Sequence, residues 1–217
     1  MSKQRTQIVG QIVELGVVAI IRMSDSNKLM RIMEALKKGG VSAIEITMST
    51  PNALKVIEAC RLEMGDDVLL GAGSILDAET ARLAILAGAK YIVSPVTNPD
   101  VIAAAHGYEA PAFPGAFTPT EIQTAHEYGA DIVKVFPADV VGMPFFRAVK
   151  APLPHVLLMP TGGVTADNAG EWIKSGASVV GAGAALLDKQ AIAAGRFEVL
   201  TENAKKLCES VANARAR

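Results

Sequence analysis

Residues 131–138, DIVKVFPA, decide the fold. β-Branched and aromatic residues stand on both sides of Lys134 at odd and even positions alike, which predicts a strand buried on both faces. Strands of that kind belong to parallel sheets whose two faces are covered by helices. The segment also poses a chemical question, because an ammonium group among aliphatic side chains is expensive to bury.

Seven further apolar runs resemble this strand and alternate with amphipathic helical patterns. They occupy residues 17–22, 43–47, 68–73, 91–96, 110–115, 156–163 and 178–187. Eight parallel strands with covered faces form either a closed barrel or an open doubly wound sheet, and eight units favour the barrel. The predicted fold class is α/β, a compact (β/α)8 TIM barrel. It forms one domain over residues 1–217, with an extra N-terminal helix (2–16) that covers the bottom of the barrel.

Capping residues mark the helix boundaries between these strands. Asp77 is a favourable N-cap for the pattern that follows it, and Gly88 marks the end of that helix. Thr118 is the N-cap of another helix, in which Pro119 fills the first turn and Glu121 completes a capping box. Local capping signals therefore agree with the alternation that the barrel requires.

The composition excludes several classes of protein. Half of the 217 residues are hydrophobic and the formal net charge is −1, so a basic surface for nucleic acid is not expected. No apolar run reaches the roughly 20 residues that a membrane helix needs. The polar, periodic N-terminus does not resemble a signal peptide. We therefore expect a cytoplasmic protein with neither nucleic acid nor membrane as a partner.

The cysteines and histidines give no sign of a metal centre. Cys60 and Cys208 fall in predicted helices, where core thiols are favoured over a disulfide or a reactive site. His106, His126 and His155 are scattered and are expected on the surface or in loops. No Cys/His spacing typical of zinc is present, so the sequence predicts no metal site.

Charged residues are rare at the carboxyl ends of the predicted strands, where a barrel of this type carries its active site. Arg22, Glu45 and Lys134 stand there, whereas Asp131 and Asp139 are expected at a strand start and in a loop. One interpretation is structural: Glu45 and Lys134 form a buried ion pair that ties two strands together. The other is functional, because buried ion pairs are often no more stabilising than hydrophobic replacements. For Arg22 the structural and the functional explanations are equally good, because a residue at the end of its strand can simply reach solvent.

The functional interpretation implies carbonyl chemistry. A lysine in a dry site loses the hydration of its charged form, which favours the neutral, nucleophilic amine. Such an amine forms a Schiff base with a carbonyl substrate. A carboxylate within hydrogen-bond or one-water reach can move the protons of that reaction, and Glu45 is the natural candidate.

Glycine-rich turns follow the last two predicted strands. Glycines there let backbone N–H groups approach an anion, and a following helix N-terminus adds positive potential. Barrels commonly bind phosphate at this place, although plain tight turns are the simpler explanation. The glycines concerned are Gly162, Gly163, Gly181 and Gly183, and a further GAGS turn puts Ser74 at the rim.

Six ordered motifs resemble those of the 2-keto-3-deoxy-6-phosphogluconate (KDPG)/4-hydroxy-2-oxoglutarate aldolase family. They are GGVSAIEIT, GAGSILD, YIVSPV, PGAFTPTE, VKVFPA and MPTGGV, and the similarity runs over most of the chain. The resemblance implies a class I aldolase on a compact barrel, commonly a homotrimer, without a metal or organic cofactor. Its substrate would be a 2-keto-3-deoxy sugar acid phosphate.

The resemblance also implies roles for individual residues. Lys134 corresponds to the Schiff-base lysine and Glu45 to the acid/base. The substrate-binding positions are Arg22, Thr47, Ser74, Pro95, Phe136 and Thr161, and the phosphate-binding positions are Gly162, Gly163, Gly181 and Gly183.

Two positions depart from the family pattern. Ser49 stands where many members have an arginine that holds the substrate carboxylate, and Arg22 is the candidate replacement. Ala184 stands where many have a phosphate-contacting serine, so backbone amides would have to serve. The MPTGG motif favours KDPG over the phosphogalactonate analogue, which remains an alternative substrate. Two further alternatives are a sugar-phosphate isomerase or epimerase with Glu45 as base, and a silent binder of phosphate ligands.

Overall fold

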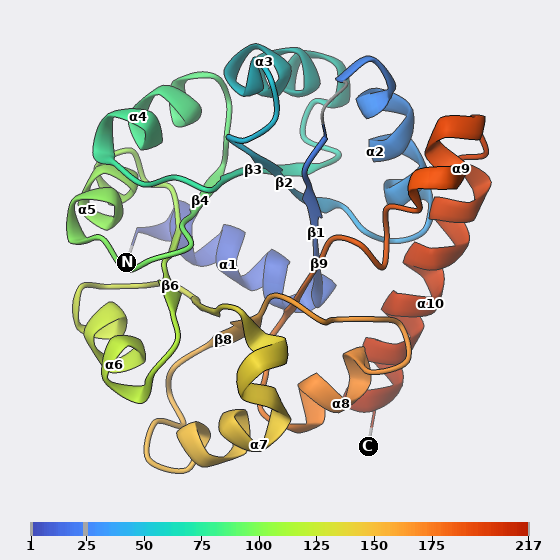
Figure 1. The fold of residues 1–217 in the computed structure, drawn as a ribbon. Helices are drawn as coiled ribbons and strands as arrows, with labels where there is room; N and C mark the ends of the chain where they lie inside the picture. The colour runs from blue at the N-terminus through green and yellow to red at the C-terminus, as the bar shows by residue number, and fades with distance from the viewer. Residues whose placement is uncertain (1, 24–25, 217) are drawn as a thin grey trace.

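The computed structural model describes residues 2–23 and 26–216, and its strands form a closed parallel barrel (Figure 1). The strands are β1 (Val17–Ile21), β2 (Ala43–Thr47), β3 (Leu69–Gly73), β4 (Tyr91–Val93), β5 (Ala112–Phe113), β6 (Gly115–Ala116), β7 (Val133–Val135), β8 (Leu158–Pro160) and β9 (Val180–Ala182). Each lies within one of the eight predicted runs except β6, which shares the run at 110–115 with β5 and ends one residue beyond it.

Helices surround the barrel and connect successive strands (Figure 1). They are α1 (Lys3–Leu15), η1 (Ser26–Lys28), α2 (Leu29–Lys38), α3 (Ala53–Met64), α4 (Ala78–Leu86), α5 (Pro99–Gly107), α6 (Pro119–Glu127), α7 (Ala138–Lys150), α8 (Ala169–Lys174), α9 (Lys189–Ala194) and α10 (Glu198–Arg215). The predicted caps are confirmed, since Asp77 accepts from the Thr80 N–H and Thr118 forms a capping box with Glu121.

Hydrogen bonds join the barrel strands into two parallel sheets, and the two sheets meet at two junctions. One has the order β5-β4-β3-β2-β1-β9 and the other β6-β7-β8. A bridge between Thr161 and Gly181 joins β8 to β9, and the chain itself joins β5 to β6 across Pro114. Pro114 has no backbone N–H to donate to a neighbouring strand, so the fifth strand of the barrel is divided into the short strands β5 and β6. The barrel that the alternation predicts is confirmed.

The last predicted strand is shorter than the apolar run at 178–187 suggests. Strand β9 ends at Ala182, and residues 183–187 form a turn instead. The N–H groups of Leu186 and Leu187 both donate to the carbonyl of Gly183, which closes that turn. An apolar composition alone did not reveal where the strand stops.

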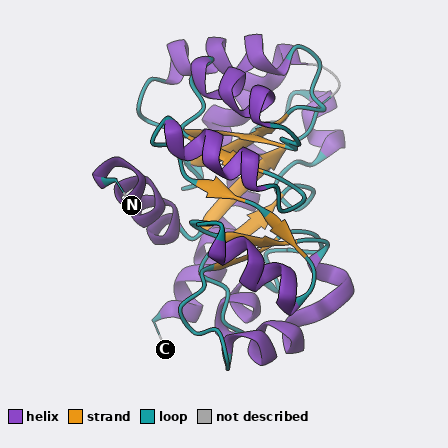
Figure 2. Ribbon diagram, turned by 90° about the vertical axis from the view of Figure 1, so that its left-hand side faces the viewer, coloured by secondary structure: helices purple, strands orange, loops and turns teal. Residues whose placement is uncertain are grey.

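The core has two parts, one on each side of the strands. Between the strands and the surrounding helices lies the larger part, to which Val133 and Val135 belong as their alternation with Lys134 predicts. Inside the barrel lies the smaller part, built from residues of the strands and of α1. Figure 2 shows α1 lying across one end of the strands, which confirms the extra helix at the bottom.

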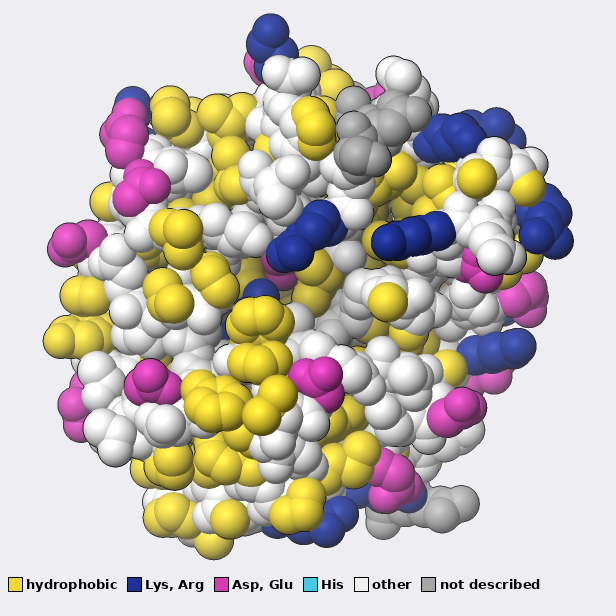
Figure 3. All heavy atoms as spheres, viewed as in Figure 1, with side chains coloured by type: hydrophobic (Ala, Val, Ile, Leu, Met, Phe, Trp, Pro, Cys, Tyr) yellow, Lys and Arg dark blue, Asp and Glu magenta, His cyan; other side chains and the backbone are white. Residues whose placement is uncertain are grey.

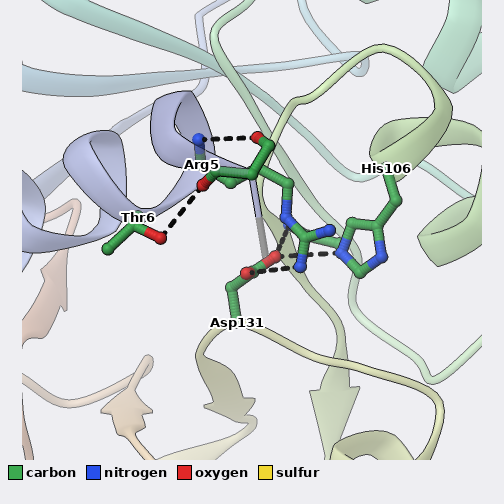
Figure 4. Close-up of polar contacts among 6 residues, drawn as sticks. Arg5, Thr6, His106 and Asp131 are labelled. Atoms are coloured by element: carbon green, nitrogen blue, oxygen red, sulfur yellow. Dashed lines mark hydrogen bonds and ion pairs between the residues drawn. The ribbon is translucent and has the colours of Figure 1, made fainter.

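A polar contact fastens α1 to the barrel (Figure 4). Arg5 donates to Asp131 over 3.0 Å, and the Nε2 atom of His106 lies 3.0 Å from the same carboxylate. The backbone N–H of Ala112 donates to Asp131 over 2.9 Å. His106 is therefore a partly buried structural residue, not the loop or surface histidine expected from the sequence. His126 and His155 are not scattered either, since their rings lie 4.7 Å apart.

The remaining expectations about composition concern thiols and membranes. Cys60 is buried in α3 and Cys208 half-buried in α10, and both are free, as predicted. Within residues 2–23 and 26–216, the helices are all too short or too polar to span a bilayer.

Candidate active site

The carboxyl ends of the strands surround a hollow that carries Glu45 and Lys134, two of the three charged candidates. Figure 3 looks onto this face and shows it hollowed at the centre. Glu45 is fully buried in β2 and Lys134 is 6% exposed in β7, on the opposite sheet. Both side chains lie on the inner face of the barrel. Their sequence neighbours Ile44, Ile46, Val133 and Val135 belong to the core between the strands and the helices, and side chains alternate along a strand.

Glu45 and Lys134 face one another without a direct ion pair. Neither carboxylate oxygen of Glu45 has a hydrogen-bond partner among the residues that the structure describes. Burial raises the pKa of Glu45, and the positive charges of Lys134 and Arg22 offset part of that rise. The structural interpretation, in which a Glu45–Lys134 bond ties two strands together, is therefore wrong. A carboxyl group whose pKa lies above its ordinary value holds a proton more readily, which suits a group that must both donate and accept protons.

A glycine provides the room for the Glu45 carboxyl group. Gly73 ends the neighbouring strand β3, and a Cβ atom there would collide with Oε1 of Glu45. Only a residue without a side chain leaves this position open. The GAGS turn, which the sequence predicts at the rim, therefore contains the glycine that makes room for the Glu45 carboxyl group.

Phe136 lies beside the lysine at the mouth of the barrel. The Nζ atom of Lys134 is 5.1 Å from the centroid of the Phe136 ring. Phe136 is 39% exposed, so it lies at the surface of this end of the barrel and is not part of the core. An aromatic face at this distance favours a nearby cation and walls one side of the site.

The other predicted substrate positions line the same strand ends. Thr47 is buried, and its hydroxyl lies 2.9 Å from that of Ser49, one of the two positions that depart from the family pattern. Ser74 follows β3 with a φ of 60°, an uncommon conformation for a residue with a side chain. Arg22 follows β1, is exposed, and lies near enough to act on the charge of Glu45.

Pro95 follows β4, and the loop that contains it packs closely against a glycine at the start of β6. A Cβ atom on Gly115 would collide with the carbonyl of Pro95. The close approach of these two segments holds the loop after β4 against the strand position that β6 occupies. Pro95 thus stands at the same rim as the other candidates.

Of the four glycines predicted as a phosphate cradle, Gly162 and Gly163 follow β8, Gly181 lies within β9 and Gly183 follows it. Each has a steric reason in the fold. Gly162 and Gly163 have φ values of 102° and 69°, and a Cβ on either would press against Asp139. A Cβ on Gly181 would lie 2.6 Å from Oγ1 of Thr161, and one on Gly183 would lie 3.2 Å from the carbonyl of Ile20. Oγ1 of Thr161 is buried and has no hydrogen-bond partner within the described part of the chain.

The helices that follow these glycines begin several residues further along the chain. Helix α8 begins only at Ala169 and helix α9 only at Lys189. Asn168, the residue before α8, donates its side-chain N–H to the Gly163 carbonyl over 2.8 Å, so the start of this helix lies beside the glycines and its contribution to anion binding stays a prediction.

Comparison with known proteins now decides the family. The family described as "KDPG and KHG aldolase" matches residues 8–202. The chain belongs to this family. Its members are lyases that catalyse aldol cleavage, so aldolase chemistry is favoured over the isomerase, epimerase and silent binder.

Three similar proteins show how this aldolase relates to its family. A 2-dehydro-3-deoxy-phosphogluconate aldolase of Treponema pallidum is 38% identical over 86% of this chain and 88% of its own length. A 2-dehydro-3-deoxy-6-phosphogalactonate aldolase of Escherichia coli is 34% identical over 80% and 85%. The KDPG aldolase of Legionella pneumophila, solved with pyruvate captured as a covalent carbinolamine, superposes with a TM-score of 0.85 at 27% identity, covering 92% and 97%.

Two residues at the site of this aldolase escaped the sequence analysis. Asp139, expected in a loop, lies in the first turn of α7 against Gly162 and Gly163. Tyr91 begins β4 and lies inside the barrel near Glu45, whereas the sequence predicts it only as part of a strand. Neither carries a local signal, because both positions suit a loop or a core equally well.

A cavity of about 950 Å³ lies away from this site, between α1 and the lower rim of the barrel. Residues that line it include Gln7, Gln11, Asp67 and Lys90. None of the candidate site residues borders it, so it plays no part in the chemistry considered for this aldolase.

Proposed function

We propose that this protein is a Schiff-base aldolase that cleaves KDPG to pyruvate and glyceraldehyde 3-phosphate. It would also cleave 4-hydroxy-2-oxoglutarate to pyruvate and glyoxylate. The observation that carries the proposal is the pair Lys134 and Glu45, buried face to face at the mouth of the barrel without a bond between them. An amine and a proton carrier with an open position between them are what imine formation requires.

The first half of the reaction forms the imine. The neutral amine of Lys134 attacks the C2 carbonyl and gives a carbinolamine. Glu45, directly or through one water molecule, protonates the C2 hydroxyl, which leaves as water while the nitrogen lone pair forms the C=N bond. Burial raises the pKa of Glu45, so its carboxyl group holds a proton more readily than a carboxyl group in water does.

The second half cleaves the carbon–carbon bond. The C4 hydroxyl loses its proton to Glu45, the C3–C4 bond breaks, and its electron pair moves to the iminium nitrogen through the new C2–C3 double bond. The aldehyde leaves with C4 as its carbonyl carbon. Protonation of the enamine at C3 and hydrolysis of the imine release pyruvate and restore Lys134. The protonated imine is the electron sink, so the route calls for no metal or organic cofactor.

The other candidates would orient the substrate. Arg22, Thr47 and Ser74 would hold the carboxylate end, with Arg22 supplying the charge that Ser49 lacks. Pro95 and Phe136 would wall the pocket, and Thr161 would offer its unpaired hydroxyl to the polyol chain. The loop amides at Gly162, Gly163, Gly181 and Gly183 would receive the phosphate.

Borohydride trapping tests this assignment. The enzyme is incubated with pyruvate, reduced, digested and analysed by mass spectrometry, and the adduct is expected on the peptide that contains Lys134. Lys134→Met should lose both the adduct and aldehyde release. Lys150→Met is the matched control, because Lys150 donates to backbone carbonyls outside the barrel mouth and should not affect trapping. An adduct-free native enzyme that still turns over would refute the proposal.

The choice between gluconate and galactonate substrates needs rates measured side by side. The two differ only in configuration at C4, and relatives of both kinds are similar to this chain. The MPTGG motif supports KDPG. We expect the larger kcat/KM for KDPG, with the phosphogalactonate analogue as the alternative and the unphosphorylated acid slower than either.

We also propose a homotrimer that works in the cytoplasm. Exposed apolar side chains gather around α4, α5 and the start of α6, where yellow patches mark the left of Figure 3. This apolar surface consists of Leu76, Leu83, Leu86, Val96 and Phe117. A surface of this kind supports association. The free thiols of Cys60 and Cys208 suit a reducing compartment.

A further inference from the structure

Tyr91 is a fully buried phenol inside the barrel whose hydroxyl has no hydrogen-bond partner among the described residues. Its ring packs on Phe113 with the centroids 5.3 Å apart, which accounts for the ring but not for the oxygen. Buried tyrosine hydroxyls nearly always find a partner, because an unpaired one loses its hydration without compensation. A phenylalanine would fill the same space at lower cost.

The strand register brings this phenol to Glu45. Glu45 of β2 is the direct partner of Gly71 on β3, and Gly71 is the direct partner of Tyr91 on β4. A Cβ atom on Gly71 would collide with Cε2 and Cζ, the hydroxyl end of the Tyr91 ring. The ring therefore lies across β3, in space that a glycine leaves free, on the same level of the barrel as Glu45.

The two groups are complementary. Both carboxylate oxygens of Glu45 lack hydrogen-bond partners in the described chain, and the phenol is a donor without an acceptor. Burial, and then the nearby charge of Glu45, hold the pKa of Tyr91 well above its ordinary value, so the phenol keeps its proton. Lys134 and Arg22 also act on Glu45, but from β7 and from the end of β1.

We infer that Tyr91 is the positioning residue for Glu45, donating its hydroxyl to the carboxylate across one water molecule. The inference rests on the proposed acid/base role of Glu45. Tyr91 is fully buried in the inner core, so it is placed to act on Glu45 and not on the substrate. It acts on orientation and on proton affinity, since a donor to a carboxylate favours the charged form.

The test compares Tyr91→Phe with Tyr128→Phe, an exposed tyrosine at the end of α6. Removing the Tyr91 oxygen should lower kcat about ten-fold, the scale of one hydrogen bond to a charged group, and leave KM unchanged. The acid limb of the kcat/KM profile should move to higher pH by about one unit, because the carboxylate loses a stabilising donor. Tyr128→Phe should change none of these quantities.

Glu45→Gln separates this inference from the proposed function. The expected result is that Glu45→Gln loses cleavage, while Tyr91→Phe keeps its borohydride adduct on Lys134 and shifts the acid limb. An unmoved acid limb in Tyr91→Phe, with Glu45→Gln inactive, overturns the role of Tyr91 and leaves the aldolase mechanism standing. A fully active Glu45→Gln overturns both, because nothing would remain to be positioned.

Discussion

At the scale of single residues, the site depends on hydroxyls and glycines as much as on charges. Gly71 and Gly73 of β3 leave space for the Tyr91 ring and the Glu45 carboxyl group. Thr161 adds a buried hydroxyl without a partner in the described chain. An unpaired polar atom of this kind lowers stability, so its presence is best explained by a partner that arrives with the substrate.

Thr161→Val tests this explanation. The substitution removes only the unpaired hydroxyl, so the free energy of unfolding should stay the same or rise, while kcat/KM for cleavage falls about ten-fold. Thr201→Val is the matched control, because the Thr201 hydroxyl donates to the Ala35 carbonyl over 3.0 Å in a buried position. It should lower stability by about 1 kcal/mol and leave kcat/KM unchanged. Unchanged cleavage in Thr161→Val would exclude a contact with substrate.

The sequence predicts some of these residues better than others. Lys134 and Glu45 stand out because a charge among β-forming residues contradicts its surroundings. Tyr91 does not stand out, since an aromatic residue at a strand start is ordinary in a core. Its importance comes from the register with Gly71 and Glu45, which no local pattern encodes.

At the scale of elements, α1 shows what a sequence can and cannot reveal. Its existence and extent follow from its own periodicity, and the helix covers Lys3–Leu15 within the predicted range 2–16. The attachment of α1 to the barrel does not follow from the local sequence, because Arg5 and Asp131 are 126 positions apart in the chain. The same holds for Asp139 and the glycines after β8, which meet only once the barrel has closed.

Asp131→Asn should loosen this attachment. Burial alone would raise the pKa of Asp131, but hydrogen bonds from His106, Ala112 and Arg5 outweigh it and hold the pKa below its ordinary value. Removing the charge leaves Arg5 without its partner and should cost on the order of 3 kcal/mol at pH 7, measured by denaturant unfolding. Faster hydrogen exchange in α1 should accompany the loss.

The cost of Asp131→Asn should also depend on pH. A lowered folded-state pKa stabilises the protein above the unfolded-state value of about 4, and this stabilisation disappears as the pH falls through the folded-state pKa. The difference between native and variant proteins should therefore shrink below about pH 4. Asp67→Asn, which breaks an exposed pair with Lys37, is the control and should show little change at any pH. An equal cost at pH 7 and pH 3 would contradict this account.

At the scale of the whole molecule, the apolar surface formed by Leu76, Leu83, Leu86, Val96 and Phe117 makes the proposed trimer testable. Light scattering should give three times the 22.7 kDa mass of one chain. Leu86→Lys puts a charge at a side chain that is 60% exposed and should shift the mass toward that of one chain. Leu62→Lys is the control, because Leu62 is 81% exposed on α3, outside this surface. A trimer that survives Leu86→Lys would place the interface elsewhere.

The division of the barrel into two sheets has a consequence for how the enzyme fails on warming. Lys134 belongs to the sheet β6-β7-β8 and Glu45 to the other sheet, so the reacting groups lie on opposite sides of the two junctions. At one junction Ser178 donates to the Leu158 carbonyl beside the Thr161–Gly181 bridge, and at the other Gly115 donates to the Val96 carbonyl beside Pro114. A slight parting of the two sheets would separate the reacting groups while each sheet keeps its own hydrogen bonds. We therefore expect heat inactivation to begin below the midpoint of the loss of helical circular dichroism. Coincident curves would mean that the two sheets open together.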